Sequence, residues 1–408
     1  MKNNLFNNSV LFAVFILLSF QTGAQKYKGL APTPPMGWNS WNHFACNVDE
    51  KLIRETADAM VSSGMKDAGY QYVNIDDCWH GTRDSLGFIH PDAERFPSGM
   101  KALADYIHAK GLKLGLYSDA GWKTCGGKPG SRGYEYQDAL TYASWGVDYL
   151  KYDWCNTEGL NAEGAYMTMS RALAAAGRPI VFSLCEWGDN KPWEWGKEIG
   201  HLWRTTGDIY NCFDCVVNYG TWNSWGVLQI LDMNKELRKH AGPEHWNDPD
   251  MMEVGNGMSF SEDRAHFSMW CMLAAPLIAG NDLRKMNKET AEILTNKEVI
   301  AVDQDPLGIQ GLMSRKLDDL EVWAKPLSNG ELAVCFLNRS TTPCEINFDW
   351  LKNPISDAVS KCSYDFSKNE YSIRDLWLKK EAGTTNTPLK AVVGGHDVFM
   401  VKLTPKNQ

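Results

Sequence analysis

Carboxylate and aromatic side chains recur at the ends of short apolar runs along the first three quarters of the chain. Asp76 and Asp77 close one run, Lys151 and Asp153 close another, and Asp208 lies just beyond a third. Glycoside hydrolysis needs two carboxyl groups flanking the scissile bond, one ionised and one protonated. Aromatic rings offer an apolar face on which a sugar stacks, and the chain has 17 Trp. These residue types together predict a carbohydrate site.

Lys151 and Asp153 are two positions apart, so on a strand they share one face. A neighbouring ammonium lowers the pKa of an Asp and keeps it ionised, as a nucleophile requires. The alternative is a salt bridge that ties down the strand end. Asp208, held partly buried with a raised pKa, would suit a general acid. Its alternative is a helix N-cap.

Other functional classes fit the sequence less well. The nine His form no HxH or HExxH arrangement, and no G-x-S-x-G elbow is present, so we expect neither a metal nor a serine nucleophile. We also expect no cofactor. With 41 Lys and Arg against 50 Asp and Glu, a net charge of −9 and no basic run, nucleic acid is not an expected partner.

The elements that must position these residues alternate between β-like runs and helical stretches from about residue 31 to 305. Eight runs with intervening helices are typical of a (β/α)8 TIM barrel, whose active site lies at the C-terminal ends of the strands. A doubly wound sheet is the alternative, but it needs a Gly-rich loop after the first strand, and residues 36–40 are not one. The runs are Met36–Trp41, Tyr70–Asp77, Leu112–Ser118, Asp148–Asp153, Ile180–Glu186, His201–Asp208, His245–Asp250 and Pro276–Asn281.

After Asp305 the sequence changes to short alternating runs separated by Asn, Gly, Ser and Pro, which is typical of an all-β domain. We therefore predict an α/β barrel domain over residues 25–305 and a C-terminal all-β sandwich over residues 306–408. The expected strands of the second domain are Leu320–Ala324, Glu331–Asn338, Cys344–Phe348, Ser372–Asp375 and Asp397–Leu403.

The N-terminus is typical of a secretory signal peptide over residues 1–24. Lys2 precedes the apolar run 10–18, which is too short to span a bilayer well, and small residues lie near Ala24. An uncleaved anchor is the alternative. We expect an exported protein, periplasmic or secreted, with no stable membrane insertion after cleavage. Export permits disulfides, and the odd count of 11 Cys leaves at least one thiol unpaired.

Seven linked motifs, one for each of seven strands in order, closely resemble the α-galactosidases of glycoside hydrolase family 27. The resemblance covers about residues 31–311. It implies a (β/α)8 barrel followed by a C-terminal β-sandwich, as expected above. The motifs span Met36–Trp41, Asn74–Trp79, Leu114–Asp119, Tyr149–Asp153, Cys185–Gly188, Trp203–Asp208 and Trp246–Met251.

The resemblance also implies roles for individual residues. It makes Asp153 the nucleophile and Asp208 the acid/base of a retaining mechanism that passes through a covalent galactosyl-enzyme. The implied substrate is a terminal α-linked D-galactose of oligosaccharides or polysaccharide side chains. Eight further positions match the substrate-binding residues of the family: Trp41, Asp76, Asp77, Tyr117, Lys151, Glu186, Arg204 and Asp250.

Two positions bear on the choice of substrate within the family. Glu186, expected to hold the O2 side with Arg204, leaves little room for an N-acetyl group. Asp76 is shorter than the residue typical of β-L-arabinopyranosidases and leaves space for the C6 hydroxymethyl group, so galactose is favoured over that alternative. A non-catalytic carbohydrate-binding protein is disfavoured because Asp153 and Asp208 are both present.

The resemblance implies two disulfides, Cys46–Cys78 and Cys125–Cys155. The family often pairs the Cys at position 185 with one shortly before strand six, which this chain lacks, so Cys185 is expected to be free or differently paired. A Cys212–Cys215 loop bridge is left open, and Cys271, Cys335, Cys344 and Cys362 have no assigned partner.

Overall fold

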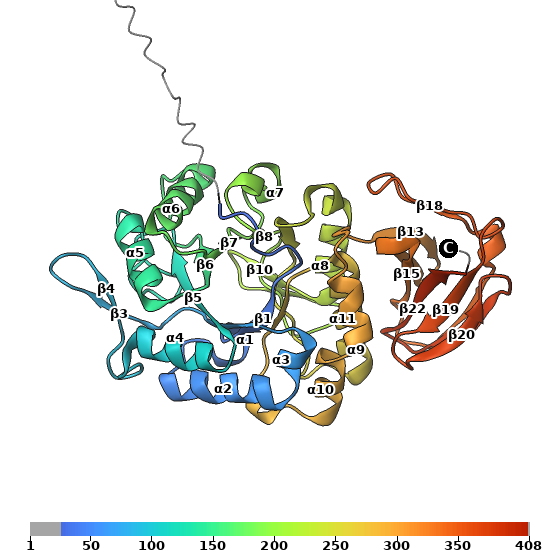
Figure 1. Ribbon diagram of the computed structural model, residues 1–408, viewed down its shortest axis with the longest axis horizontal. Coiled ribbons are helices and arrows are strands. Elements are labelled where there is room, and N and C mark those ends of the chain that lie inside the picture. The colour runs from blue at the N-terminus through green and yellow to red at the C-terminus, as the bar shows by residue number, and fades with distance from the viewer. Residues whose placement is uncertain (1–25, 407–408) are drawn as a thin grey trace, which may run out of the picture.

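The computed structural model describes residues 26–406. The predicted signal peptide lies outside these residues. The chain forms two parts that lie side by side, a barrel built from the first three quarters and an antiparallel β-domain at the C-terminus (Figure 1).

The barrel sheet has eight strands, and each neighbouring pair is parallel. Seven strands lie inside a predicted run, and the third extends one residue beyond its run, to Asp119. A single bridge between Met252 and Ala279 closes the ring between the last two strands. The other seven strands are shorter than predicted because the polar ends of the runs curve into loops. The eight strands are β1 (Met36–Asn39), β2 (Tyr72–Ile75), β5 (Lys113–Asp119), β6 (Tyr149–Asp153), β7 (Val181–Cys185), β8 (Leu202–Arg204), β11 (Trp246–Asp248) and β12 (Leu277–Ala279).

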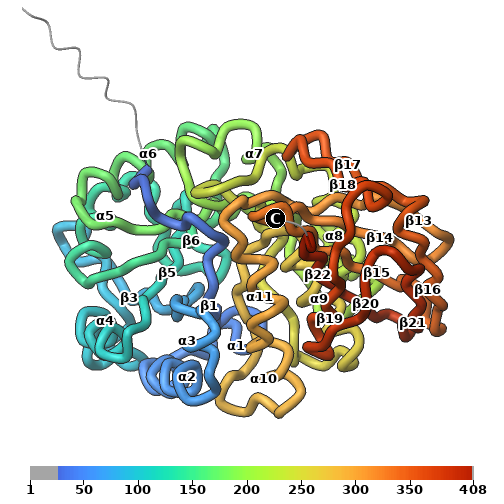
Figure 2. The backbone as a smooth tube through the Cα atoms, turned by 45° about the vertical axis from the view of Figure 1, so that its right-hand side comes forward, coloured from blue at the N-terminus to red at the C-terminus, as the bar shows by residue number. Residues whose placement is uncertain are grey.

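Helices surround the sheet, as the tube in Figure 2 shows. The side chain of Asp49 caps the first long helix by accepting from the N–H of Leu52, and Ser259 with Glu262 forms a capping box on α9. The longer helices are α2 (Glu50–Ser62), α4 (Gly99–Ala109), α5 (Glu135–Trp145), α6 (Ala162–Ala176), α8 (Val227–Asn234), α9 (Phe260–Leu273), α10 (Lys288–Leu294) and α11 (Lys297–Asp303), and the shorter ones α1 (Trp41–Phe44), α3 (Met65–Ala68) and α7 (Pro192–Trp195).

Two hairpins extend from the loops that follow barrel strands. One joins β3 (His80–Arg83) to β4 (Ile89–Pro91), and the other joins β9 (Val216–Asn218) to β10 (Asn223–Trp225). The second lies between β8 and α8, in the loop that carries Asp208, so it belongs to the end of the barrel where the active site is expected.

The C-terminal domain is a β-sandwich, as predicted, with a six-stranded antiparallel sheet and a shorter layer on one face. The sequence located five of its strands and missed β13, β17, β18, β20 and β21, because these are short or mostly exposed. The main sheet is β13 (Leu312–Leu317), β14 (Leu320–Pro326), β15 (Leu332–Asn338), β22 (Asp397–Pro405), β19 (Tyr371–Asp375) and β20 (Lys380–Thr384), and the shorter pairs are β16 (Cys344–Phe348) with β21 (Leu389–Val393) and β17 (Ile355–Ser356) with β18 (Ser363–Tyr364).

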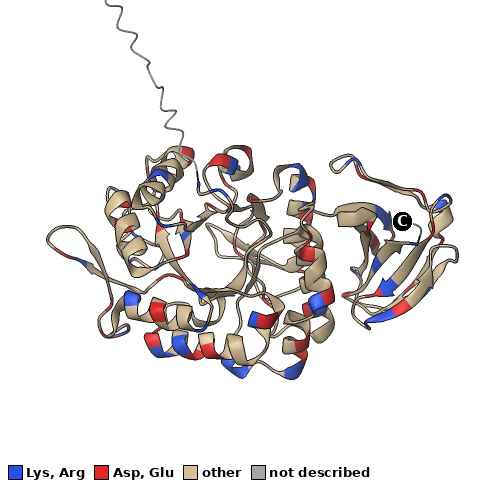
Figure 3. Cartoon of the chain, viewed as in Figure 1, with Lys and Arg blue, Asp and Glu red and all other residues tan. Residues whose placement is uncertain are grey.

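The sandwich packs on the barrel through an apolar core that both domains share. Trp323, Leu337 and Met400 of the sandwich belong to the same buried cluster as Phe267 and Trp270 of α9. Four Arg–carboxylate pairs cross this contact, and we call them the domain seam. They are Arg238–Asp357, Arg264–Asp397, Arg339–Asp232 and Arg374–Glu298. Elsewhere, charges of both signs are mixed over the outer helices (Figure 3).

The structure contains both disulfides implied by the family resemblance, Cys46–Cys78 and Cys125–Cys155, and also Cys212–Cys215. The remaining cysteines are free, and three of them, Cys185, Cys271 and Cys335, are buried, while Cys344 and Cys362 are partly exposed. Within residues 26–406 we find no helix of sufficient length and apolar character to cross a membrane.

Candidate active site

A cavity of about 460 Å³ opens at the C-terminal ends of the barrel strands. Its volume lies in the range typical of small-molecule sites. Nine of the ten predicted catalytic and substrate-binding residues line it; Glu186 does not. The nine are Trp41, Asp76, Asp77, Tyr117, Lys151, Asp153, Arg204, Asp208 and Asp250.

Asp76 and Asp77 are buried where β2 turns into its loop. One oxygen of Asp76 accepts hydrogen bonds from Asn39 Nδ2 at 2.7 Å and from Lys151 Nζ at 2.9 Å. Backbone N–H groups of Cys78 and Gly126 donate to the two oxygens of Asp77, each at 2.6 Å. Both carboxyls are therefore fixed by their neighbours before a ligand arrives, which favours selective binding of sugar hydroxyls.

Lys151 and Asp153 share the inner face of β6, as their spacing predicts. The ion pair of Lys151, however, is with Asp76 and not with Asp153. Burial raises the pKa of Asp153 to about 7, and the Lys151 charge opposes this rise without overcoming it. Lys151 thus lowers the pKa of Asp153 as the sequence predicted, but burial raises this pKa more strongly than the lysine lowers it.

Arg204 forms ion pairs with the carboxylates of Asp208 and Asp250. Its Nη2 lies 2.8 Å from Asp250 Oδ2 and 3.1 Å from Asp208 Oδ1. Burial raises the pKa of Asp250 to about 6 although Arg204 opposes the rise. The side chain of Asp208 is 41% exposed and that of Asp250 is 6% exposed. Asp208 is therefore open to solvent at the cavity edge and is less buried than the sequence suggested.

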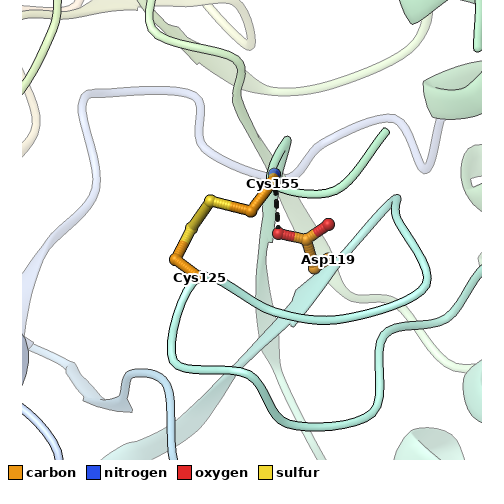
Figure 4. A group of neighbouring side chains, drawn as sticks. All are labelled: Asp119, Cys125 and Cys155. Atoms are coloured by element: carbon orange, nitrogen blue, oxygen red, sulfur yellow. Dashed lines mark hydrogen bonds between the residues drawn. A yellow bond between two sulfur atoms is a disulfide. The ribbon is translucent and has the colours of Figure 1, made fainter. Parts of the chain in front are cut away.

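Next to β6, Asp119 holds two loops in place (Figure 4). Its carboxyl accepts from the N–H of Cys155 at 2.9 Å and from the N–H of Gly121 at 2.6 Å. Burial, followed by the charge of Asp153, raises the pKa of Asp119 to about 9. Asp119, Cys125 and Cys155 are near enough for metal ligation, but the two sulfur atoms are bonded to each other, so this group serves to hold the loop after Asp153.

Glu186 lies outside the set of cavity-lining residues. Its Oε2 accepts from the backbone N–H and the side-chain amide of Asn190, at 2.6 and 2.7 Å. Trp187, the next residue, lines the cavity instead and has a φ of +57°. Asn190 thus holds one oxygen of Glu186 in the turn that presents Trp187, while Oε1 is buried without a hydrogen-bond partner. The contact of Glu186 with O2 of the sugar stays a prediction.

Several lining residues were not singled out from the sequence. Glu253 is buried at the cavity, where Asn42 and Asn256 donate to its carboxylate and burial raises its pKa to about 7. In the sequence, Glu253 is indicated only by being a carboxylate that follows shortly after the end of β11. The other lining residues that were missed are aromatic, and the sequence indicates them by several Tyr and Trp in the loop after Asp208. They are Tyr210, Tyr219 and Trp222.

Comparison with known proteins places the chain in a family. Residues 33–305 match the family model described as alpha galactosidase A, and residues 317–403 match the alpha galactosidase C-terminal beta sandwich domain. An alpha-galactosidase A of Cellvibrio japonicus is 60% identical, over 96% of each chain.

Solved structures agree in fold and extent. An α-galactosidase from Saccharomyces cerevisiae, solved with raffinose, has a TM-score of 0.86 and 32% identity over 94% of this chain and 100% of its own. A family 27 β-L-arabinopyranosidase from Geobacillus stearothermophilus is more distant, with a TM-score of 0.77 and 25% identity over 92% and 97% of the two chains. The chain therefore belongs to the α-galactosidases of glycoside hydrolase family 27 and is a glycoside hydrolase of that activity.

Proposed function

We propose that the enzyme is a retaining α-galactosidase that removes terminal α-linked D-galactose from oligosaccharides or polysaccharide side chains. The observation that carries the proposal is the contrast between two carboxyls in one cavity. Asp153 is buried at its base, whereas Asp208 is half exposed at its edge. A buried group suits attack on the anomeric carbon, and an exposed one suits exchange of a proton with a leaving alcohol and then with water.

In this mechanism, Asp153 attacks the anomeric carbon while Asp208 protonates the glycosidic oxygen. The bond to the leaving sugar breaks, and a covalent β-galactosyl ester forms on Asp153. Asp208, now ionised, then accepts a proton from water, whose oxygen displaces the ester and releases galactose with its α configuration retained. Arg204 Nη2 lies 3.1 Å from Asp208 Oδ1 and orients this carboxyl at the cavity edge.

Recognition of galactose is assigned to the opposite wall. Asp76 and Asp77 accept hydrogen bonds from the axial O4 and from O6, which Lys151 supports by donating to Asp76. Trp41 closes the C5–C6 end of the sugar. The raffinose bound to the yeast neighbour supports α-galactoside oligosaccharides as substrates. The presence of three disulfides supports an exported protein, because such bonds persist in oxidising compartments.

The stereochemistry of the first product tests the mechanism. Proton NMR during rapid hydrolysis of p-nitrophenyl α-D-galactopyranoside should show α-galactose first, followed by slow mutarotation. Appearance of β-galactose first would show inversion and overturn the assignment of Asp153 as nucleophile. The ratio of kcat/KM for this substrate to that for p-nitrophenyl β-L-arabinopyranoside tests the choice of sugar, and a preference for arabinose would overturn it.

A further inference from the structure

Three exposed aromatic side chains belong to the loop that follows Asp208. Tyr210, Tyr219 and Trp222 are 43%, 49% and 50% exposed, and all three line the cavity. Exposed apolar surface that continues from a binding cavity marks a place where a ligand extends beyond it. None of the roles derived above for the galactose ring uses these residues.

The aromatic group belongs to the loop that begins at Asp208. The N–H of Trp225 on β10 donates to the carbonyl oxygen of Asp208 at 3.0 Å, and the N–H of Tyr210 donates to the carbonyl oxygen of Trp225 at 2.9 Å. The Cys212–Cys215 disulfide closes the loop at the base of the hairpin. The backbone that places Asp208 therefore also places the hairpin.

At the tip of this hairpin the rings of Tyr219 and Trp222 stack, with centroids 4.3 Å apart and planes inclined by 18°. The N–H of Tyr219 donates to the carbonyl oxygen of Trp222 at 2.9 Å, and Gly220 between them has a φ of +89°, which a glycine adopts without strain. Because each ring already holds the other, little conformational freedom remains to be lost when a ligand packs on the pair.

The chemistry of the leaving group decides what this surface binds. A general acid must contact the glycosidic oxygen, so the leaving sugar departs on the side where Asp208 lies. We propose that Tyr219 and Trp222, together with Tyr210 of the same loop, form a subsite for the pyranose rings of an oligosaccharide leaving group. This inference rests on the proposed role of Asp208 as the acid. It makes the enzyme selective for galactose attached to a further chain of sugars.

A purely structural role is the alternative, since aromatic pairs across two strands stabilise a hairpin. Two substrates separate these roles. Methyl α-D-galactopyranoside needs acid assistance but has no leaving sugar, whereas raffinose needs the same assistance and has a disaccharide leaving group. Loss of a leaving-group subsite lowers kcat/KM for raffinose alone. Damage to the hairpin disturbs Asp208 and lowers kcat/KM for both substrates.

The experiment measures kcat/KM of Trp222→Ala and Tyr219→Ala on both substrates. We expect about a tenfold fall on raffinose and no change on methyl galactoside. Tyr136→Ala is the matched control, because Tyr136 on α5 is 50% exposed and does not line the cavity; it should alter neither value. Trp222→Phe keeps an aromatic face and should recover most of the activity on raffinose. If Trp222→Ala does not fold, Tyr219→Ala supplies the test of the subsite.

An equal fall on both substrates, or no fall on either, would overturn the subsite. Failure of the proposed acid is distinguished by Asp208→Asn, which should lower kcat/KM on both substrates. If that variant retains activity on methyl galactoside, the assignment of the acid fails, independently of the results on Trp222.

Discussion

The active-site cavity and the domain seam both contain buried carboxyl groups, but the two regions compensate the charge of these groups differently. At the seam, Arg238 contacts both oxygens of Asp357, at 2.6 and 2.9 Å. Burial alone would raise the pKa of Asp357, but hydrogen bonds from Arg238 and Ser360 bring it down to about 2. In the cavity, burial dominates, and the pKa values of Asp153 and Asp250 are raised to about 7 and about 6.

This difference follows from geometry. An arginine fork satisfies a carboxylate with two parallel hydrogen bonds, as Arg374 does for Glu298 at 2.7 Å on each oxygen. In the cavity one arginine is shared between Asp208 and Asp250, and the lysine contacts Asp76 while Asp153 has only a backbone donor. The seam therefore contributes stability, whereas the cavity keeps carboxyls ready to bind hydroxyls and exchange protons at some cost in stability.

Among the substitutions that test this difference between cavity and seam, the one in the cavity has the largest expected effect, and that effect is on catalysis. Asp153→Asn should lower kcat on the order of 10⁴-fold or more, because the amide neither attacks nor leaves as a carboxylate does. The same variant should unfold at an equal or higher temperature, since it removes a carboxyl whose ionisation burial disfavours. Steady-state kinetics and thermal unfolding on one preparation provide both readings. Near-normal kcat, or a fall explained by unfolding, would contradict the assignment.

At the seam the opposite behaviour is expected. Arg238→Ala leaves Asp357 buried without its partner, which should lower the free energy of unfolding by about 3 kcal/mol while the folded enzyme keeps its kcat. Chemical denaturation measures the loss. The control is Arg171→Ala, because Arg171 is exposed on α6 and its removal should change stability little. Equal stability of the two variants would show that the seam pair contributes nothing.

The buried carboxyls of the barrel helices and those of the seam should also respond differently to pH. For a carboxyl whose pKa is raised in the folded state, the unfolded chain binds fewer protons between the two pKa values, so stability falls as pH rises through that window. Burial raises the pKa of Asp263 to about 7 and that of Asp303 to about 8. The melting temperature should therefore fall between about pH 5 and about pH 8.

Asp263→Asn should flatten this slope, because its amide oxygen can still accept from the N–H of Gly255 while the titrating group is gone. The seam shows the opposite dependence of stability on pH. The stabilising contribution of Asp357 is present above its ordinary pKa and is lost as pH falls toward about 2. A melting temperature that rises from about pH 5 to about pH 8 would contradict this account of the barrel.

Much of this arrangement could be predicted from the sequence, because apolar runs that end in polar residues indicate the strands of a barrel. All eight runs contain a strand, and Lys151 and Asp153 lie on the inner face as a period of two requires. The same period places Ser183 and Cys185 of β7 on the inner face, whereas Glu186 and Trp187 follow the strand end, where the period no longer applies.

Other features could not be predicted from local sequence patterns. The partner of Lys151 follows a strand two positions away in the sheet, and the pKa of Asp153 depends on how deeply the surrounding loops bury it. Neither feature is encoded in one run. The seam pairs join residues more than 70 positions apart, and the aromatic hairpin becomes part of the site only through its bonds to the backbone of Asp208. Such contacts arise from the packing of complete elements.

The smallest predicted effect concerns Glu186 and separates a residue behind the cavity from one inside it. Glu186→Gln keeps an oxygen that can accept from Asn190, so the turn and Trp187 should stay in place and kcat/KM should fall by about threefold at most. Direct contact of this carboxylate with O2 of galactose would instead make a charge-assisted bond whose loss costs far more. Trp187→Ala removes a residue that lines the cavity, so its fall in kcat/KM is the reference for the fall of Glu186→Gln. A larger fall for Glu186→Gln than for Trp187→Ala would return Glu186 to the sugar-binding set.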